Sequence, residues 1–184
     1  MFSLYKFCKV IAKAFLKILY RVKVVGNVSL PENSGYIICS NHLKAIDPVL
    51  IGCFMKRKMR FMGKKELFKI PILSWIFKQL GGFPVDRGKG DLIAIKTAVE
   101  ILKSNNVMTM FPEGTRSKTG ELGEFKKGAV LIASRANVPI VPVKISGNYK
   151  LFSRMTLTIG KPIYITKENR NTATEELYKV IEKM

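Results

Sequence analysis

The sequence predicts a single α/β domain in which a mixed, mostly parallel sheet is flanked by helices. Short runs rich in β-branched and aromatic residues alternate with helical stretches along most of the chain. The 184 residues suffice for one domain with a hydrophobic core, but they are too few for two ordinary domains. Apolar residues make up 47% of the chain, which is a globular composition.

The first expected element is an amphipathic helix that precedes the sheet, over residues 4–22. Its cations recur at steps of three and four and gather on one side: Lys6, Lys9, Lys13, Lys17 and Arg21. The apolar residues come round to the opposite side: Leu4, Phe7, Ile11, Phe15, Ile18 and Val22. Such a helix suits a membrane surface, so we assign residues 1–24 to a membrane-associating helix and residues 25–184 to the α/β domain. Alternatively, the apolar side packs on the domain and the basic side is solvated, and the two interpretations can also hold together.

The remaining elements follow in order. Short apolar runs predict strands over residues 36–39, 59–62, 83–85, 107–111, 140–145 and 155–159. Helical spacing of apolar residues predicts helices from about residue 48 and over residues 67–79, 91–103, 126–136 and 172–183. Because strand–helix–strand crossovers join parallel strands, much of the sheet should be parallel.

The chain is strongly basic, with 32 Lys and Arg against 13 Asp and Glu and a net charge of +19. This surplus attracts polyanions, which include nucleic acid, an anionic bilayer and phosphorylated small molecules. A basic nucleic-acid-binding domain is a remote alternative, because no recognised nucleic-acid-binding module occurs in the sequence.

The cysteines and the hydropathy exclude two further classes. Three cysteines without ligand-like spacing predict neither a disulfide framework nor a metal site. The longest uncharged stretch, residues 33–43, has eleven residues and is too short to span a bilayer.

Polar clusters directly follow three of the predicted strands. They are Asn41-His42 with Asp47, then Asp86-Arg87, then Glu113-Gly114-Thr115-Arg116. If these strands are parallel, the clusters meet at the carboxyl edge of the sheet, where open α/β folds bind ligands. The sequence therefore predicts a site at this edge.

His42 is the only histidine in the chain, so any step that needs an imidazole must use it. Asp47 lies five residues further on, close enough for a bend to bring its carboxylate to the ring and fix the tautomer. This pattern indicates a general base with an orienting partner. The alternative is a helix start, with Asp47 capping the segment that begins at Pro48.

Three further features suit an anionic lipid. Arg116 and Arg87 offer guanidinium groups, which bind phosphate through bidentate hydrogen bonds. Gly114, close to Arg116, lets the backbone approach a ligand. The alternatives are a plain turn with a solvated arginine and a surface ion pair of Arg87 with Asp86. The basic run over residues 56–69 leads into the apolar residues 70–77, an order that suits a lipid headgroup followed by its chain. The alternative is a solvated basic loop followed by a buried helix.

Four blocks in this order resemble the glycerolipid acyltransferases of the lysophosphatidate acyltransferase type. The blocks are Asn41-His42 with Asp47-Pro48, residues 82–87, residues 111–117 and residues 138–143. The stretch Lys64-Lys65-Glu66-Leu67 between the first two blocks is also similar to the family. Four ordered blocks are far more specific than any one of them.

The resemblance implies a role for each site residue. His42 would be the general base and Asp47 its partner, with Asn41 supporting the motif. The acceptor's phosphate and glycerol would be held by Arg87, Arg116, Lys64 or Lys65, and Glu113, Gly114 and Thr115. The donor would be acyl-coenzyme A or acyl-carrier protein, with no metal and no other cofactor.

The resemblance further implies transfer of a fatty acyl group to the free sn-2 hydroxyl of lysophosphatidate, on the cytoplasmic face of a membrane that the protein binds peripherally. Lys44 and Ala45 stand at two positions of the first motif, and many members of the family have a small hydroxyl residue at one of these two positions. Another lysolipid or glycerol 3-phosphate therefore remains an alternative acceptor. A non-catalytic lipid-binding protein of the same fold is a rival that the presence of both His42 and Asp47 disfavours.

Overall fold

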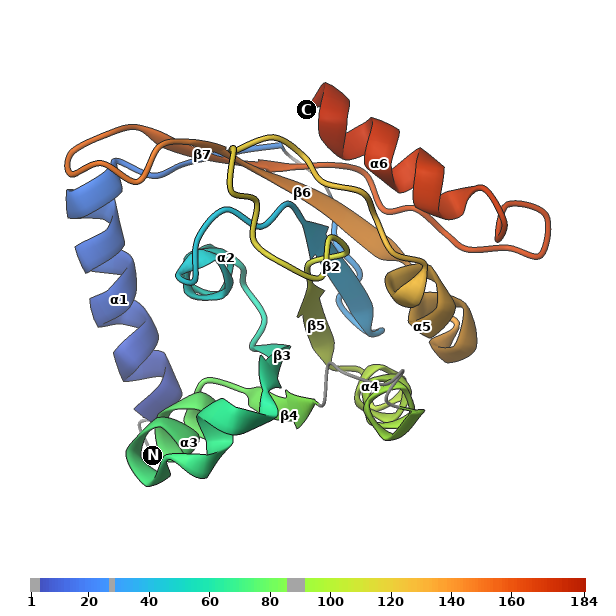
Figure 1. The fold of residues 1–184 in the computed structure, drawn as a ribbon, viewed down its shortest axis with the longest axis horizontal. Coiled ribbons are helices and arrows are strands. Elements are labelled where there is room, and N and C mark those ends of the chain that lie inside the picture. The colour runs from blue at the N-terminus through green and yellow to red at the C-terminus, as the bar shows by residue number, and fades with distance from the viewer. Residues whose placement is uncertain (1–3, 27–28, 86–91) are drawn as a thin grey trace.

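The computed structural model describes residues 4–26, 29–85 and 92–184. It forms one seven-stranded sheet with helices on both faces (Figure 1), in the strand order β1-β7-β6-β2-β5-β3-β4. The strands are β1 (Lys23–Val25), β2 (Tyr36–Ser40), β3 (Met59–Lys64), β4 (Gly82–Val85), β5 (Val107–Met110), β6 (Ile140–Gly147) and β7 (Met155–Ile159). The helices are α1 (Leu4–Tyr20), α2 (Asp47–Phe54), the short 3-10 helix η1 (Lys65–Lys69), α3 (Pro71–Gln79), α4 (Leu92–Lys103), α5 (Gly128–Ala136) and α6 (Ala173–Lys183).

All strand pairs are parallel except β6 with β7, which pair antiparallel. The predicted single α/β domain with a mixed, mostly parallel sheet is therefore confirmed. The central strand β2 lies between β5 and β6 and is buried along its whole length. Its carboxyl end leads directly to His42.

Alternation along β2 divides the core between the two faces of the sheet. Ile37 and Cys39 pack in the cluster that also contains residues of α4, α5 and α6. Tyr36 and Ile38 pack in the cluster that contains residues of α2 and Leu16 of α1. Figure 1 shows the same arrangement, with α1 and α2 on one side of the strands and α4, α5 and α6 on the other.

Helix α1 packs on α2 through Leu16, which is buried, while five other large apolar residues of the helix face solvent. Phe7, Val10, Ile11, Phe15 and Ile18 are each more than half exposed. The interpretation in which this apolar side packs on the domain is therefore wrong. The helix also ends at Tyr20, two residues earlier than expected, and Arg21 has a positive φ of 38°.

Two of the cations predicted for the solvated side of α1 turn toward the domain instead. The ammonium group of Lys9 donates to the carbonyl of Met55, and that of Lys13 lies 5.3 Å from the ring centroid of Phe54. Lys6 and Lys17 are exposed.

The helix predicted over residues 67–79 is divided at Pro71. A proline disfavours helical backbone at the preceding residue, and Ile70 accordingly is extended, with φ −87° and ψ 114°. Proline is well suited to the first helical position, so α3 begins at Pro71 itself. Ile72 and Trp75 of this helix are exposed, so α3 is not the buried helix of the alternative interpretation. The three-residue strand β1 was not predicted.

Candidate active site

Register brings the first and third polar clusters to one level of the sheet. Cys39 of β2 pairs with Met110 of β5, so His42 and Glu113 both lie three residues beyond this pair. The main-chain N–H of His42 donates to the Glu113 carboxylate over 2.8 Å. Lys64 ends β3, which pairs with β5 on its other side. The predicted meeting of these clusters at the carboxyl edge is thus observed, whereas Asp86 and Arg87 lie outside the described residues.

His42 and Asp47 form a close pair. The Nδ1 atom of His42 lies 2.8 Å from Oδ2 of Asp47, and the carboxylate is fully buried. The same oxygen accepts the main-chain N–H groups of Leu43 at 2.6 Å and Lys44 at 2.8 Å. A carboxylate at this nitrogen favours the tautomer with the proton on Nδ1, which leaves Nε2 free to accept a proton.

The helix-start interpretation of Asp47 is only partly correct. Asp47 is the first residue of α2 and Pro48 follows it, but the N-cap position belongs to Ile46 and has no side-chain cap. The Asp47 carboxylate points back to the turn that carries His42. It therefore shapes this turn and holds the imidazole.

Tyr149, in the loop between β6 and β7, is a site residue that the sequence analysis missed. Its hydroxyl donates to Oδ1 of Asp47, the oxygen that His42 does not contact. Burial, together with this hydrogen bond, raises the pKa of Tyr149, so the hydroxyl keeps its proton and remains a donor. Tyr149 is 102 residues from Asp47 in the sequence, and no local pattern signals the contact.

The main chain of His42 is held from both sides by the loop after β5. Glu113 accepts from the N–H of His42 with one oxygen and from the N–H of Gly123, at 3.0 Å, with the other. Ser117 donates its N–H to the carbonyl of His42 over 2.8 Å. The imidazole also stacks on Phe111, with ring centroids 4.0 Å apart. These contacts fix both the backbone and the ring plane of His42.

Asn41 fixes the end of β2 to the neighbouring strand. Its side-chain amide donates to the carbonyl of Ile145 at 2.9 Å and accepts the N–H of Ile145 at 2.8 Å. This buried pair extends the β2–β6 contact by one residue, just before His42.

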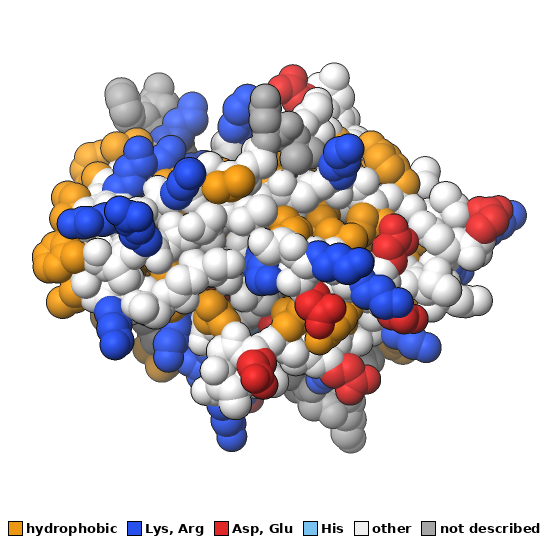
Figure 2. Space-filling model, turned by 90° about the horizontal axis from the view of Figure 1, so that it is seen from above, with side chains coloured by type: hydrophobic (Ala, Val, Ile, Leu, Met, Phe, Trp, Pro, Cys, Tyr) orange, Lys and Arg blue, Asp and Glu red, His pale blue; other side chains and the backbone are white. Residues whose placement is uncertain are grey.

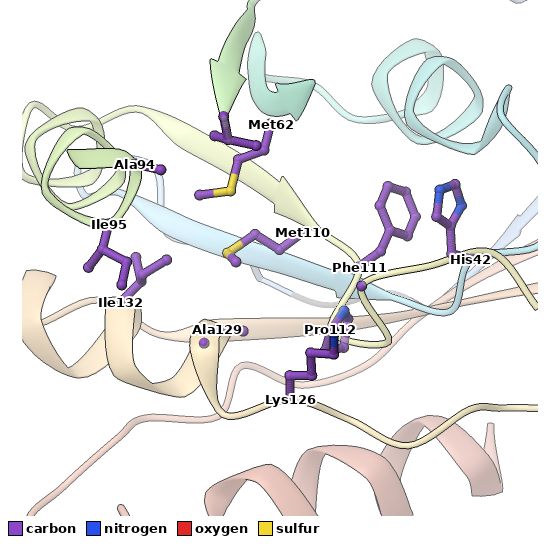
Figure 3. A pocket seen from close by; sticks show the side chains of 13 residues that line it. His42, Met62, Ala94, Ile95, Met110, Phe111, Pro112, Lys126, Ala129 and Ile132 are labelled. Atoms are coloured by element: carbon purple, nitrogen blue, oxygen red, sulfur yellow. The ribbon is translucent and has the colours of Figure 1, made fainter. Parts of the chain in front are cut away.

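An apolar pocket of about 340 Å³ opens beside His42. Figure 3 shows Met62, Met110, Ile95 and Ile132 converging on it from β3, β5, α4 and α5. Phe111 lies between this apolar interior and the imidazole. A pocket lined this way suits a hydrocarbon chain whose reactive end lies at His42.

Lys126 is a second site residue that the sequence analysis missed. Its side chain lines the pocket with His42 and Gly114, and Gly114 has a positive φ of 72°. A Cβ atom at Gly114 would lie 3.0 Å from the Lys126 ammonium, so the glycine lets this flexible cation approach the backbone closely. A signal did exist: Lys126 and Lys127 precede α5, where a helix dipole disfavours cations.

The other predicted binding residues lie on the surface. Thr115 and Arg116 are exposed, in the loop that holds His42. Lys64 and Lys65 are exposed as well, and the ammonium group of Lys64 lies 3.8 Å from the carboxylate of Glu66. All four side chains are accessible to a ligand at this edge.

Among the described residues, no cluster of three or more His, Cys, Asp and Glu side chains could hold a metal ion. Cys39, three residues before His42, is fully buried, and burial raises the pKa of its thiol. A buried, protonated thiol is a poor nucleophile.

The His42–Asp47 pair at the opening of an apolar pocket suits general-base chemistry on an apolar substrate. The chain belongs to the Acyltransferase family, whose model matches residues 21–146. Enzymes of this family need no cofactor, and their acyl donor is a co-substrate.

Individual relatives agree with this assignment. The chain is 35% identical over 167 residues to the 1-acyl-sn-glycerol-3-phosphate acyltransferase of Bacillus subtilis, covering 88% of this chain and 83% of the relative. It is 33% identical to the enzyme of that name from Saccharomyces cerevisiae, covering 86% of this chain and 54% of the relative. The crystal structure of the 1-acyl-sn-glycerophosphate acyltransferase PlsC from Thermotoga maritima matches 98% of this chain and 77% of its own, with a TM-score of 0.76 and 27% identity.

Proposed function

We propose that this protein transfers a fatty acyl group from a thioester donor to the free sn-2 hydroxyl of lysophosphatidate, giving phosphatidate in phospholipid biosynthesis. The observation that carries the proposal is the His42–Asp47 pair at the opening of the apolar pocket, which Lys126 also lines. The names of the relatives support lysophosphatidate as the acceptor.

In the proposed mechanism, Nε2 of His42 removes the proton of the acceptor hydroxyl while the oxygen attacks the thioester carbonyl. Asp47 orients the ring and stabilises the imidazolium that forms. The tetrahedral intermediate then collapses, the C–S bond breaks, and the departing sulfur takes the proton from His42. The acyl group passes directly from sulfur to oxygen, so no acyl-enzyme forms.

The acceptor's phosphate is proposed to bind Lys126, which lines the pocket, together with Arg116 and Lys64 or Lys65, which are exposed. Arg87 is proposed as a further phosphate ligand from its place in the sequence alone. Arginine and lysine donate charge-assisted hydrogen bonds to phosphate oxygens. Gly114 and Thr115 would meet the glycerol. Both oxygens of Glu113 bind backbone N–H groups, so its effect on the glycerol would pass through the loop that it fixes.

The apolar pocket is proposed to hold the donor's fatty acyl chain, while the carrier, coenzyme A or acyl-carrier protein, remains outside. Methionine and isoleucine side chains from four elements line its interior, and Lys126 and His42 lie at its opening. Burial of each methylene group from water contributes about 0.8 kcal/mol.

We further propose that residues 1–24 associate with the membrane and that residues 25–184 form the acyltransferase domain. The support is the exposed apolar side of α1, beside the exposed cations Lys6 and Lys17. In the part of the chain that the structure describes, no helix is both long and apolar enough to cross a bilayer. We therefore propose peripheral binding at the anionic, cytoplasmic face, with the excess of cations serving lipid rather than nucleic acid.

An acceptor panel tests the proposed reaction. Purified protein and a radiolabelled acyl-coenzyme A or acyl-carrier protein are supplied with lysophosphatidate, glycerol 3-phosphate or lysophosphatidylcholine. We expect labelled phosphatidate from lysophosphatidate as the fastest product. Faster acylation of another acceptor would show that this acceptor, and not lysophosphatidate, is the preferred substrate. Binding without turnover on any acceptor would favour a non-catalytic lipid-binding protein.

A further inference from the structure

The loop between β6 and β7, residues 148–154, presents two adjacent large apolar side chains to solvent. Leu151 is 66% exposed and Phe152 is 60% exposed. Phe152 also has a φ of +61°, a left-handed conformation that bulky side chains rarely adopt. Neither side chain contributes to the core, so the fold itself does not explain them, and strained positions of this kind often serve function.

Specific contacts hold this loop in place against the end of α1. The N–H of Phe152 donates to the carbonyl of Leu19 over 2.6 Å, and the N–H of Ser153 donates to the carbonyl of Lys150 over 3.1 Å. The ring of Tyr149 packs edge-on against Tyr20, with centroids 5.4 Å apart. The loop therefore packs against the last turn of α1, and together the loop and the helix form a surface that exposes Leu151, Phe152, Phe15 and Ile18.

The charged side chains in the two chain segments that form this surface are all positive. The cations nearest to it in the chain are all exposed: Lys17, Arg21, Lys150 and Arg154. No acidic residue occurs before Glu32, and none occurs between Glu124 and Glu168, so both segments that build the surface lack carboxylates. Figure 2 shows apolar side chains beside Lys and Arg at the left end of the molecule, the end where Figure 1 places α1 and this loop.

Apolar side chains flanked only by cations fit an anionic lipid surface. They fit a second copy of this chain poorly, because each copy would bring the same positive charge to the contact. We propose that Leu151 and Phe152 enter the lipid surface together with the apolar side of α1, so that the β6–β7 loop is a second membrane-contact element. This inference rests on the membrane association of α1 proposed above.

Tryptophan reporters test the loop separately from the helix. Trp75 is the only tryptophan of the chain, so Trp75→Phe provides a background for a single new reporter. In that background, Phe152→Trp and Phe15→Trp are mixed with phosphatidylglycerol–phosphatidylcholine vesicles that carry brominated acyl chains. Tyr164→Trp is the control, because Tyr164 is 63% exposed but lies in the segment between β7 and α6.

We expect bromolipid quenching and a blue shift for the reporters at 152 and 15, and neither for the reporter at 164. Quenching at 15 without quenching at 152 would overturn the loop proposal and leave α1 as the membrane element. Quenching at neither position would overturn both. Quenching at 152 in a protein that fails to acylate lysophosphatidate would support the loop and refute the proposed reaction.

A loss-of-contact variant provides a second measure. Leu151→Ser with Phe152→Ser should raise the dissociation constant for the same vesicles about tenfold, since two large apolar side chains leave the lipid. Its thermal unfolding should match the wild type, because both side chains are exposed. An unchanged dissociation constant would overturn the proposal. So would a lipid-free dimer of the wild type that this variant abolishes, because the surface would then belong to a second copy.

Discussion

The hydroxyl of Tyr149 and the side chain of His42 bind different oxygens of the same buried carboxylate, that of Asp47. The carboxylate is therefore held on both sides, and its orientation toward the imidazole depends on a loop far away in the sequence. Tyr149 touches no reacting atom in the proposed mechanism and would act by positioning Asp47.

Tyr149→Phe should lower kcat about tenfold and leave both Michaelis constants near their wild-type values. The change removes only the hydroxyl, and a lost hydrogen bond to a charged group typically costs about 1.5–3 kcal/mol. Tyr178→Phe is the matched control, because that ring packs on Phe125 and not on the dyad. Steady-state kinetics measure kcat and both Michaelis constants, and an equal loss of kcat in the two variants would refute a positioning role.

Arg116→Ala and Lys126→Gln should each raise the Michaelis constant for lysophosphatidate about tenfold or more, because a charge-assisted contact with its phosphate is lost. Donor binding should change less. Lys103→Gln, at the end of α4, serves as a control for the loss of one positive charge. The same variants are measured with a monoacylglycerol acceptor, which lacks the phosphate. An equal effect on this acceptor would contradict a phosphate-binding role.

Phe15→Ser should weaken binding to anionic vesicles in a salt-independent way, since an exposed apolar contact with lipid is removed. Lys6→Gln with Lys17→Gln should weaken it mainly at low salt, because screening already removes the charge contribution at high salt. Tyr164→Ser is the control for an exposed aromatic residue elsewhere. Co-sedimentation that none of these changes alters would show that α1 does not contact the membrane.

Ile95→Trp should shift the donor preference toward shorter acyl chains. Ile95 lines the pocket from α4, and a larger side chain there reduces the space for the hydrocarbon end of the donor. The measurement is the ratio of kcat/KM for a long-chain and a short-chain acyl-coenzyme A. A ratio equal to that of the wild type would place the acyl chain elsewhere.

The sequence predicted those features that depend on local pattern. The alternation of strands and helices indicated the mostly parallel sheet, and the position of His42, Asp47 and Glu113 just after strands indicated a shared edge. Both were observed because parallel register carries such residues to one level. The orientation of α1 could not be predicted, since either side of an amphipathic helix can face the domain.

The contacts that the sequence analysis missed are tertiary. Tyr149 reaches Asp47 only because β6 lies beside β2, and no spacing in the sequence encodes that neighbour. Lys126 lines the pocket beside Gly114, twelve residues earlier in the sequence, and no local pattern signals that contact. The short strand β1 depends on its pairing with β7, which lies at the other end of the chain.

The rate of acyl transfer by His42→Ala tests the central claim most directly. No other histidine exists in the chain, so no second imidazole can replace the general base. With lysophosphatidate and acyl-coenzyme A or acyl-carrier protein, kcat should fall by about a hundredfold to ten-thousandfold, while the thermal unfolding curve and lysophosphatidate binding are retained. A folded variant that keeps more than about a tenth of the wild-type rate would contradict the assignment of His42 as the base.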